Sequence, residues 1–124
     1  MSQQLPGEME VMNKIVSASA TGRLEFPPGS LWAFPMPDGQ NSVEFVASDI
    51  LNQEWRLEVS IRNEGRIAKP WLRGEWGAYA RKKKLRKHDR VILTMNEGEN
   101  GERTYRIRAE REHYGLWQSI DEQQ

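Results

Sequence analysis

The stretch that decides the fold runs from residue 55 to residue 95, and it opens with Trp55-Arg56-Leu57-Glu58-Val59-Ser60-Ile61-Arg62. Every odd position in this octapeptide is apolar and every even position is polar, which is the period of a strand with one buried face. Residues 63–66 have the composition of a turn or loop, and a second short strand is predicted at residues 67–73. Pro70 restricts that second strand to an edge or an end position in a sheet.

The period changes after Gly74. Trp76, Tyr79, Ala80 and Lys83 follow one another at i, i+3, i+4 and i+7, which predicts a helix of about two turns. We expect this helix to bury Trp76 and Tyr79, and to leave three cations in water: Arg81, Lys82 and Lys84. Alternation returns from Asp89, and one face of that strand carries Val91, Leu93 and Met95.

The flanking sequence adds short elements of the same kinds. On the N-terminal side, strands are predicted at residues 11–16, 24–26 and 42–48, with Ser30 as the cap of a single helical turn at residues 31–33. On the C-terminal side, Asn100-Gly101 predicts a tight hairpin that leads into a strand at residues 103–110. Residues 111–124 show no clear period, but three of them are expected to pack back on the body: Tyr114, Leu116 and Trp117.

This pattern predicts a mainly β protein. About seven short strands and two short helical segments favour a closed or nearly closed barrel, because closure removes exposed sheet edges. With 124 residues the chain is long enough for one domain with a single core. We expect a disordered tail at residues 1–10, a folded domain at 11–110 and a C-terminal tail at 111–124.

The charge is distributed unevenly along the chain. The whole sequence is balanced, with 18 basic and 18 acidic residues, but residues 56–90 contain twelve basic and only four acidic ones. Such asymmetry produces a local field that attracts polyanions while the molecule stays near neutral. There is no cysteine, no signal peptide and no apolar run of membrane-spanning length, so we expect a soluble intracellular protein with no membrane partner.

Catalysis and cofactor binding find little support in the sequence. The two histidines, His88 and His113, lack both the spacing and the acidic neighbours of a metal or general-base site. Gly98 and Gly101 belong to a hairpin, because no strand-to-helix transition follows them. We therefore expect a protein that is not an enzyme, with no cofactor, no metal and no small-molecule substrate.

An ordered series of residues resembles the plant B3 DNA-binding domain over residues 11–110. The series comprises Arg23-Leu24, Pro27 or Pro28, Phe34-Pro35, Gly39, Trp55-Arg56-Leu57, Gly65, Lys69-Pro70, Leu72, Gly74, Trp76, Tyr79, Leu85, Asp89 and Val91. The resemblance implies a seven-stranded open barrel with two short helices. It also implies sequence-specific binding of double-stranded DNA in transcriptional regulation, and hence a nuclear location.

The resemblance further implies two arms that enter the major groove, one between the first two strands and one between the fourth and fifth. The first arm would carry Ser17, Ser19, Thr21, Gly22 and Arg23, and the second Arg62, Asn63, Glu64, Arg66 and Lys69. Arginine and asparagine have the donors that read guanine and adenine edges, whereas lysines and hydroxyls mainly position a protein on phosphates. The predicted DNA-binding residues are thus Lys14, Ser17, Ser19, Thr21, Arg23, Arg62, Asn63, Arg66, Lys69 and Arg73.

Several alternatives remain open from the sequence. A domain that has lost specific readout would serve as a protein-interaction or dimerisation module, with itself or another regulator as partner and weak, non-specific DNA binding. A single-strand or RNA binder would use its tryptophans as stacking platforms, although their apolar positions favour a core role. The basic run at residues 81–87 suits a nuclear localisation signal, a phosphate patch or a solvated helix end.

Overall fold

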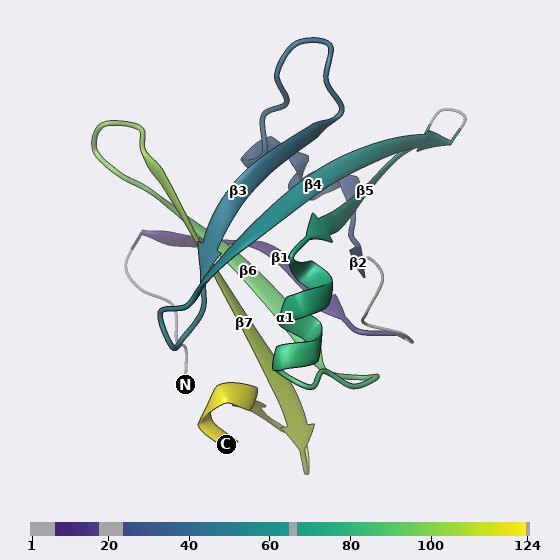
Figure 1. The fold of residues 1–124 in the computed structure, drawn as a ribbon. Helices are drawn as coiled ribbons and strands as arrows, with labels where there is room; N and C mark the ends of the chain where they lie inside the picture. The colour runs from purple at the N-terminus through teal and green to yellow at the C-terminus, as the bar shows by residue number, and fades with distance from the viewer. Residues whose placement is uncertain (1–6, 18–23, 65–66, 124) are drawn as a thin grey trace.

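A computed structural model describes residues 7–17, 24–64 and 67–123. Seven strands follow one another in a single curled sheet, in the order β1-β6-β7-β3-β4-β5-β2, and β8 pairs with β7 outside this path (Figure 1). The strands are β1 (Glu8–Ile15), β2 (Leu24–Glu25), β3 (Ser42–Ser48), β4 (Glu54–Glu64), β5 (Ile67–Gly74), β6 (Arg90–Glu97), β7 (Arg103–His113) and β8 (Leu116–Ser119). The helical elements are η1 (Pro28–Ala33), α1 (Trp76–Lys82) and η2 (Ile120–Gln123). The expected mainly β, seven-stranded open barrel with two short helices, η1 and α1, is confirmed.

The sheet is open because its two end strands, β1 and β2, are not neighbours in the hydrogen-bonded order. The η1 turn lies between these ends. The Ser30 hydroxyl donates to the carbonyl oxygen of Val11 in β1 at 2.6 Å, while Phe26 N–H donates to Pro70 O of β5 at 3.1 Å. A short 3-10 turn thus connects the two edges where a strand pair would close a full barrel.

The inner face of the curled sheet is packed with apolar side chains. The inward faces predicted for β4 and β6 are buried, as Leu57, Val59, Val91 and Met95 show, and Ala47 of β3 is buried with them, but β6 does not alternate in burial, because five consecutive residues of it are buried. Phe34, the residue that follows η1, lies over this face and stacks on Tyr105 of β7, with ring centroids 5.5 Å apart. The barrel interior therefore holds a core and leaves ligand binding to loops, edges and outer faces.

Helix α1 forms where the change of period predicts it, and it buries Trp76, Tyr79 and Ala80. Gly74 makes the abrupt turn from β5 into this helix possible. Its φ is +74°, and a Cβ on this residue would lie 2.8 Å from the carbonyl oxygen of Arg56 in β4. Only glycine tolerates both the left-handed backbone and this close approach.

Some expectations from the sequence are wrong in detail. Ser30 is not a helix cap, because η1 already begins at Pro28, where the missing N–H of proline is tolerated. The first strand begins at Glu8, before the expected residue 11. Tyr114 and Leu116 do not pack back on the body but are exposed at the β7–β8 hairpin. The C-terminal segment is instead attached by Ile120, which is buried, and by Trp117, whose ring lies 4.2 Å from the Arg90 guanidinium carbon.

Candidate nucleic-acid interface

The end of the β4–β5 hairpin presents two exposed cations. Arg62 and Lys69 face each other across the strand pair, and both are exposed. The Arg62 guanidinium lies 6.0 Å from the centroid of the Trp71 ring, at the outer limit of a cation–π contact. Further from the hairpin end, the Arg73 side chain is 55% exposed and lies 3.9 Å from the Glu58 carboxylate. The predicted second arm therefore begins with cations directed to solvent.

The first arm leaves the sheet at the end of β1. Lys14 is partly buried in that strand opposite Val91, and Ser17 is exposed just beyond it. The other predicted residues of this arm, Ser19, Thr21 and Arg23, lie outside the described residues. Arg66 of the second arm does so too, as does the side chain of Asn63. The interface is thus described through the residues on either side of both arms.

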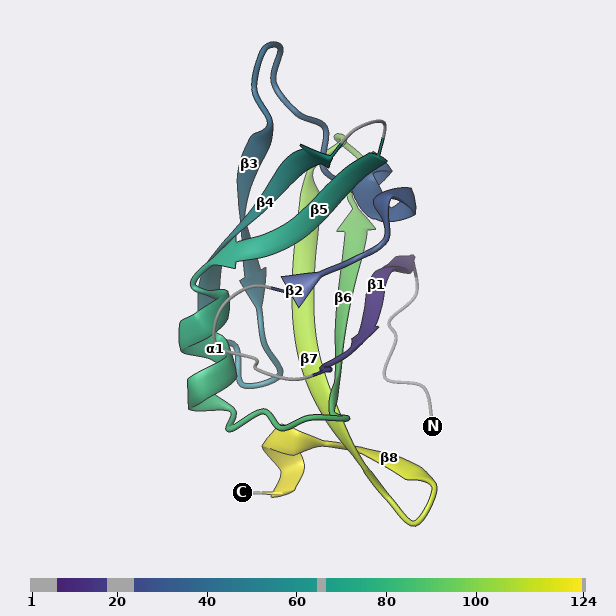
Figure 2. The ribbon, with the colours of Figure 1, turned by 90° about the vertical axis from the view of Figure 1, so that its right-hand side faces the viewer.

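The first arm connects β1 to β2, so it ends at the edge of the sheet formed by β2 and β5, which Figure 2 turns toward the viewer. The strand that follows the first arm, β2, pairs with the strand that follows the second, β5, through Leu24 opposite Leu72. Ile67, where β5 begins, lies five positions from Leu72, which is about 17 Å at roughly 3.3 Å per residue. This separation is on the scale of the major groove of B-DNA, which is about 12 Å wide.

The tryptophans of the central stretch serve mainly the core. Trp76 is fully buried, and Trp55 packs edge-on against Tyr79 with ring centroids 5.3 Å apart. The Trp55 indole N–H is also committed, because it donates to Asp49 Oδ2 at 3.0 Å. These two rings are not platforms for unpaired bases. Trp32 is the most exposed described tryptophan, and it lies on η1.

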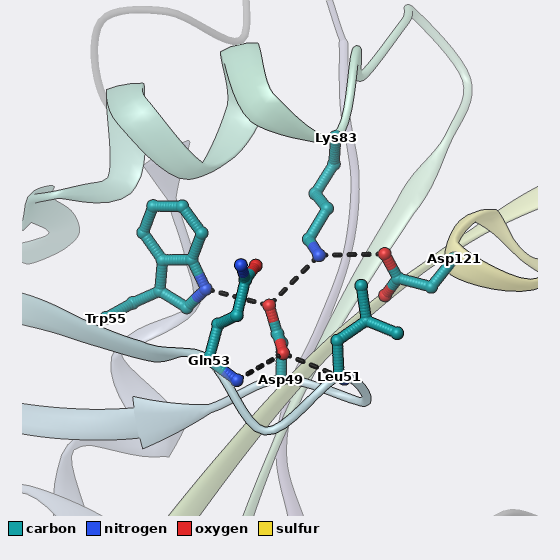
Figure 3. Close-up of polar contacts among 6 residues, drawn as sticks. All are labelled: Asp49, Leu51, Gln53, Trp55, Lys83 and Asp121. Carbon is teal, nitrogen blue, oxygen red and sulfur yellow. Dashed lines mark hydrogen bonds and ion pairs between the residues drawn. The ribbon is translucent and has the colours of Figure 1, made fainter. Parts of the chain in front are cut away.

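Lys83, the residue that follows α1, is held in a buried ion-pair cluster (Figure 3). Its Nζ lies 3.0 Å from Asp49 Oδ2 and 2.8 Å from Asp121 Oδ1, and its side chain is only 2% exposed. The other oxygen of Asp49 accepts the backbone N–H groups of Leu51 and Gln53. The cluster thus joins the end of α1 to the β3–β4 loop and to η2.

The charges of this cluster are stabilised against their burial. Burial raises the pKa of Asp49, but hydrogen bonds from Trp55, Lys83 and Gln53 outweigh it, so the net shift of its pKa is downward. Burial lowers the pKa of Lys83, but bonds to Asp121 and Asp49 outweigh that and its pKa is raised. Both groups therefore stay ionised at neutral pH. The sequence pattern placed Lys83 on the buried face of the helix but gave no sign of its two acidic partners.

The described parts of the chain contain neither a metal-binding cluster nor a membrane-spanning helix. Among residues 7–17, 24–64 and 67–123, no group of three or more histidine and acidic side chains is arranged to hold a metal ion. Within the same ranges, no helix has the length and apolar character needed to cross a membrane. The predicted DNA-binding residues whose side chains the structure describes are Lys14 and Ser17 at the end of β1, and Arg62, Lys69 and Arg73 on the β4–β5 hairpin.

Comparison with known proteins identifies the fold. No protein-family model and no curated protein sequence matches the chain. Among solved structures, an Arabidopsis FUS3–DNA complex matches with a TM-score of 0.63 and 12% identity, over 80% of this chain and 96% of that one. The Arabidopsis thaliana transcription factor LEC2, also solved with DNA, matches with a TM-score of 0.65 and 13% identity, over 82% and 93%. The chain therefore has the fold of plant B3 domains, and these two structures with that fold are DNA complexes.

Proposed function

We propose that this protein binds double-stranded DNA through its two arms, without catalysis, and acts in transcriptional regulation in the nucleus. The observation that carries the proposal is the pairing of β2 with β5, which brings the strand that follows the first arm beside the strand that follows the second. Support comes from the fold, which the chain shares with two proteins solved in complex with DNA. The packed inner face adds to this, because it directs any large ligand to the loops and edges.

The residues of the two arms divide into candidates for base contacts and candidates for phosphate contacts. Arg62, Asn63 and Arg66 have side chains suited to base edges, and each bidentate pair contributes about 1–3 kcal/mol of discrimination. Lys69, Arg73, Lys14 and Ser17 are suited to phosphates, where they position the domain and carry little sequence information. The hydroxyls of Ser19 and Thr21 and the guanidinium of Arg23 belong to the same arm as Ser17, so we assign them to the phosphate backbone as well.

The experiment is a selection of bound duplexes from a random pool at low salt, followed by affinity measurements with two matched variants. Arg62→Ala should relax sequence preference at one base pair, by about 1–3 kcal/mol. Arg56→Ala removes an exposed arginine from the same face of the same strand, six positions from Arg62, and should leave that preference intact.

Two outcomes would count against the proposal. If the wild-type protein shifts no duplex at low salt, DNA binding is refuted. If it binds every duplex equally, and both variants weaken binding equally on all of them, specific readout fails. The second result would favour a protein-interaction or dimerisation module with residual affinity for DNA.

A further inference from the structure

We propose that five cations form a second contact surface, which binds the phosphate backbone of the duplex beside the first arm. Two of them lie in the last turn of α1 and three lie in the segment that follows it. We call this surface the basic ledge, and its members are Arg81, Lys82, Lys84, Arg86 and Lys87. The inference rests on the proposed function, since it extends the footprint of the same DNA. It assigns the ledge to sequence-independent affinity and leaves base readout to the arms.

The positive charges of the ledge have no carboxylate partner among the described residues. All five side chains are exposed, and none forms an ion pair or hydrogen bond with another described side chain. Four arginines of the sheet differ in this respect, because each lies within 3.9 Å of a carboxylate: Arg73, Arg90, Arg108 and Arg111. Five exposed cations without a side-chain partner among the described residues thus lie within a segment of seven residues.

The helix dipole does not account for this concentration. Cations in the last turn of a helix are stabilised by its negative end, but the effect falls off within that turn. Arg86 and Lys87 lie beyond α1, which ends at Lys82. Five cations around a helix of two turns exceed what its dipole stabilises, and their mutual repulsion is relieved when a polyanion binds.

The backbone of the ledge is also held in a fixed shape. Lys83, in its middle, points inward to Asp49 and Asp121, so the exposed residues on either side project from a pinned backbone. Arg111 donates to both carboxylate oxygens of Asp89 at 2.9 Å and to the carbonyl oxygen of Lys84 at 3.1 Å. Asp89 in turn accepts the N–H of Arg86 at 2.7 Å. A preformed surface loses little backbone entropy when it binds.

The ledge also lies next to the start of the first arm. The segment after α1 is bonded to the start of the first arm, because His88 N–H donates to Val16 O and Val16 N–H donates to Asp89 O, both at 2.8 Å. Figure 2 shows α1 and the segment leading to β6 below β2, with the β4–β5 end above it. The eight residues of β5 and the seven of α1 are about 26 Å and about 11 Å long, so together they span at most roughly 37 Å. One turn of B-DNA is about 34 Å long.

The same observations disfavour a localisation peptide as the role of this run in the folded protein. Its central lysine is buried, and the backbone on both sides is hydrogen-bonded to the body. Binding as an extended peptide would require this part of the domain to unfold. A rigid cationic surface next to an arm suits a phosphate backbone instead.

The test measures the affinity of one selected duplex as a function of salt. The triple variant Lys82→Gln/Arg86→Gln/Lys87→Gln keeps Lys83 and the left-handed Lys84 unchanged. Each phosphate contact contributes about 0.9 to the slope of log affinity against log salt, so the triple variant should flatten that slope by about 2.7. Its affinity at 0.1 M salt should fall on the order of 100-fold. Discrimination between the selected duplex and a scrambled one should not change.

Lys87→Gln and Arg56→Gln provide the matched single-charge pair, because each removes one exposed cation without a described partner. Only Lys87→Gln should flatten the slope, by about 0.9. If wild type binds the duplex but the triple variant keeps its slope and affinity, the ledge inference is overturned and DNA binding stands. If wild type binds no duplex, the proposed function itself fails. A triple variant that keeps duplex affinity but loses binding to phosphatidylserine vesicles would assign the ledge to a membrane surface, and would also overturn the inference.

Discussion

Replacing Lys83 by methionine should destabilise the fold strongly. The substitution preserves the length of the side chain but removes the cation between two carboxylates that are 0% and 2% exposed. Asp49 keeps three N–H donors, from Leu51, Gln53 and Trp55, whereas Asp121 loses the cation that compensates its burial. Removing one member of a buried ion pair costs about 3–5 kcal/mol, so we expect a loss of this size in the free energy of unfolding. For a domain of this size that is a fall in Tm of roughly 10–20 °C.

Urea unfolding followed by tryptophan fluorescence measures this loss, and two variants locate its cause. Asp121→Asn should cost less than Lys83→Met, because Lys83 keeps Asp49 at 3.0 Å. Lys83→Met/Asp121→Leu should recover much of the stability, since an apolar pair leaves no uncompensated charge at that position. A loss below about 1 kcal/mol for Lys83→Met would refute the reasoning, because that is the range of a solvated surface ion pair.

Further predictions concern the turn into α1, acid stability and the tryptophans. Gly74→Ala should cost about 2 kcal/mol or more in unfolding free energy, because it adds a clash with Arg56 O to the strain of a left-handed backbone. Gly39→Ala, at a φ of +76° with no atom near the new Cβ, should cost only the backbone strain of about 1 kcal/mol. Equal costs for the two variants would contradict this prediction. Because folding lowers the pKa of Asp49, its contribution is full above the ordinary value of about 3.9 and is lost as pH falls through the folded pKa. Urea unfolding of Asp49→Asn should therefore show a deficit against wild type at pH 6 that shrinks below about pH 4, and a deficit that persists there would argue against it. In a Trp32→Phe/Trp71→Phe/Trp117→Phe variant, which keeps only Trp55 and Trp76, single-stranded oligonucleotides should not quench the fluorescence, since both remaining rings belong to the core; quenching would revive the stacking interpretation.

The architecture was largely predictable because local periodicity reports which face of an element is buried. The alternation in β4 and the i, i+3, i+4, i+7 spacing of α1 each led to the observed burial. Pro70 was also informative. Its carbonyl oxygen accepts the N–H of Phe26 on the outer side of β5, so the missing N–H of the proline falls at the thinly covered edge of the sheet.

What periodicity misses is contact between side chains far apart in the sequence. Ile92 and Thr94 lie on the outer face of β6, yet they are only 2% and 1% exposed. Their cross-strand partners on that face are Arg108 and Arg106, whose long apolar stems can cover them. Whether a long polar side chain covers an outward residue depends on strand register, which one sequence does not reveal.

The candidate interface shows the same limit. The helical spacing placed Lys83 on the apolar face of α1, but nothing local showed what compensates its charge, because Asp49 and Asp121 lie 34 residues before it and 38 residues after it. The site residues of the arms were named through family resemblance, and their direct contact with DNA stays a prediction. The ledge became apparent only when exposure and ion pairing separated the cations of the run.

Backbone amide chemical-shift mapping with the selected duplex tests the central claim most directly. The account predicts that the perturbed amides cluster in three segments on one side of the molecule: residues 16–25, residues 61–70 and residues 81–88. The hairpins at residues 97–103 and 113–116 should be unaffected. Perturbations confined to those two hairpins, or spread evenly over the surface, would contradict DNA binding at this sheet edge.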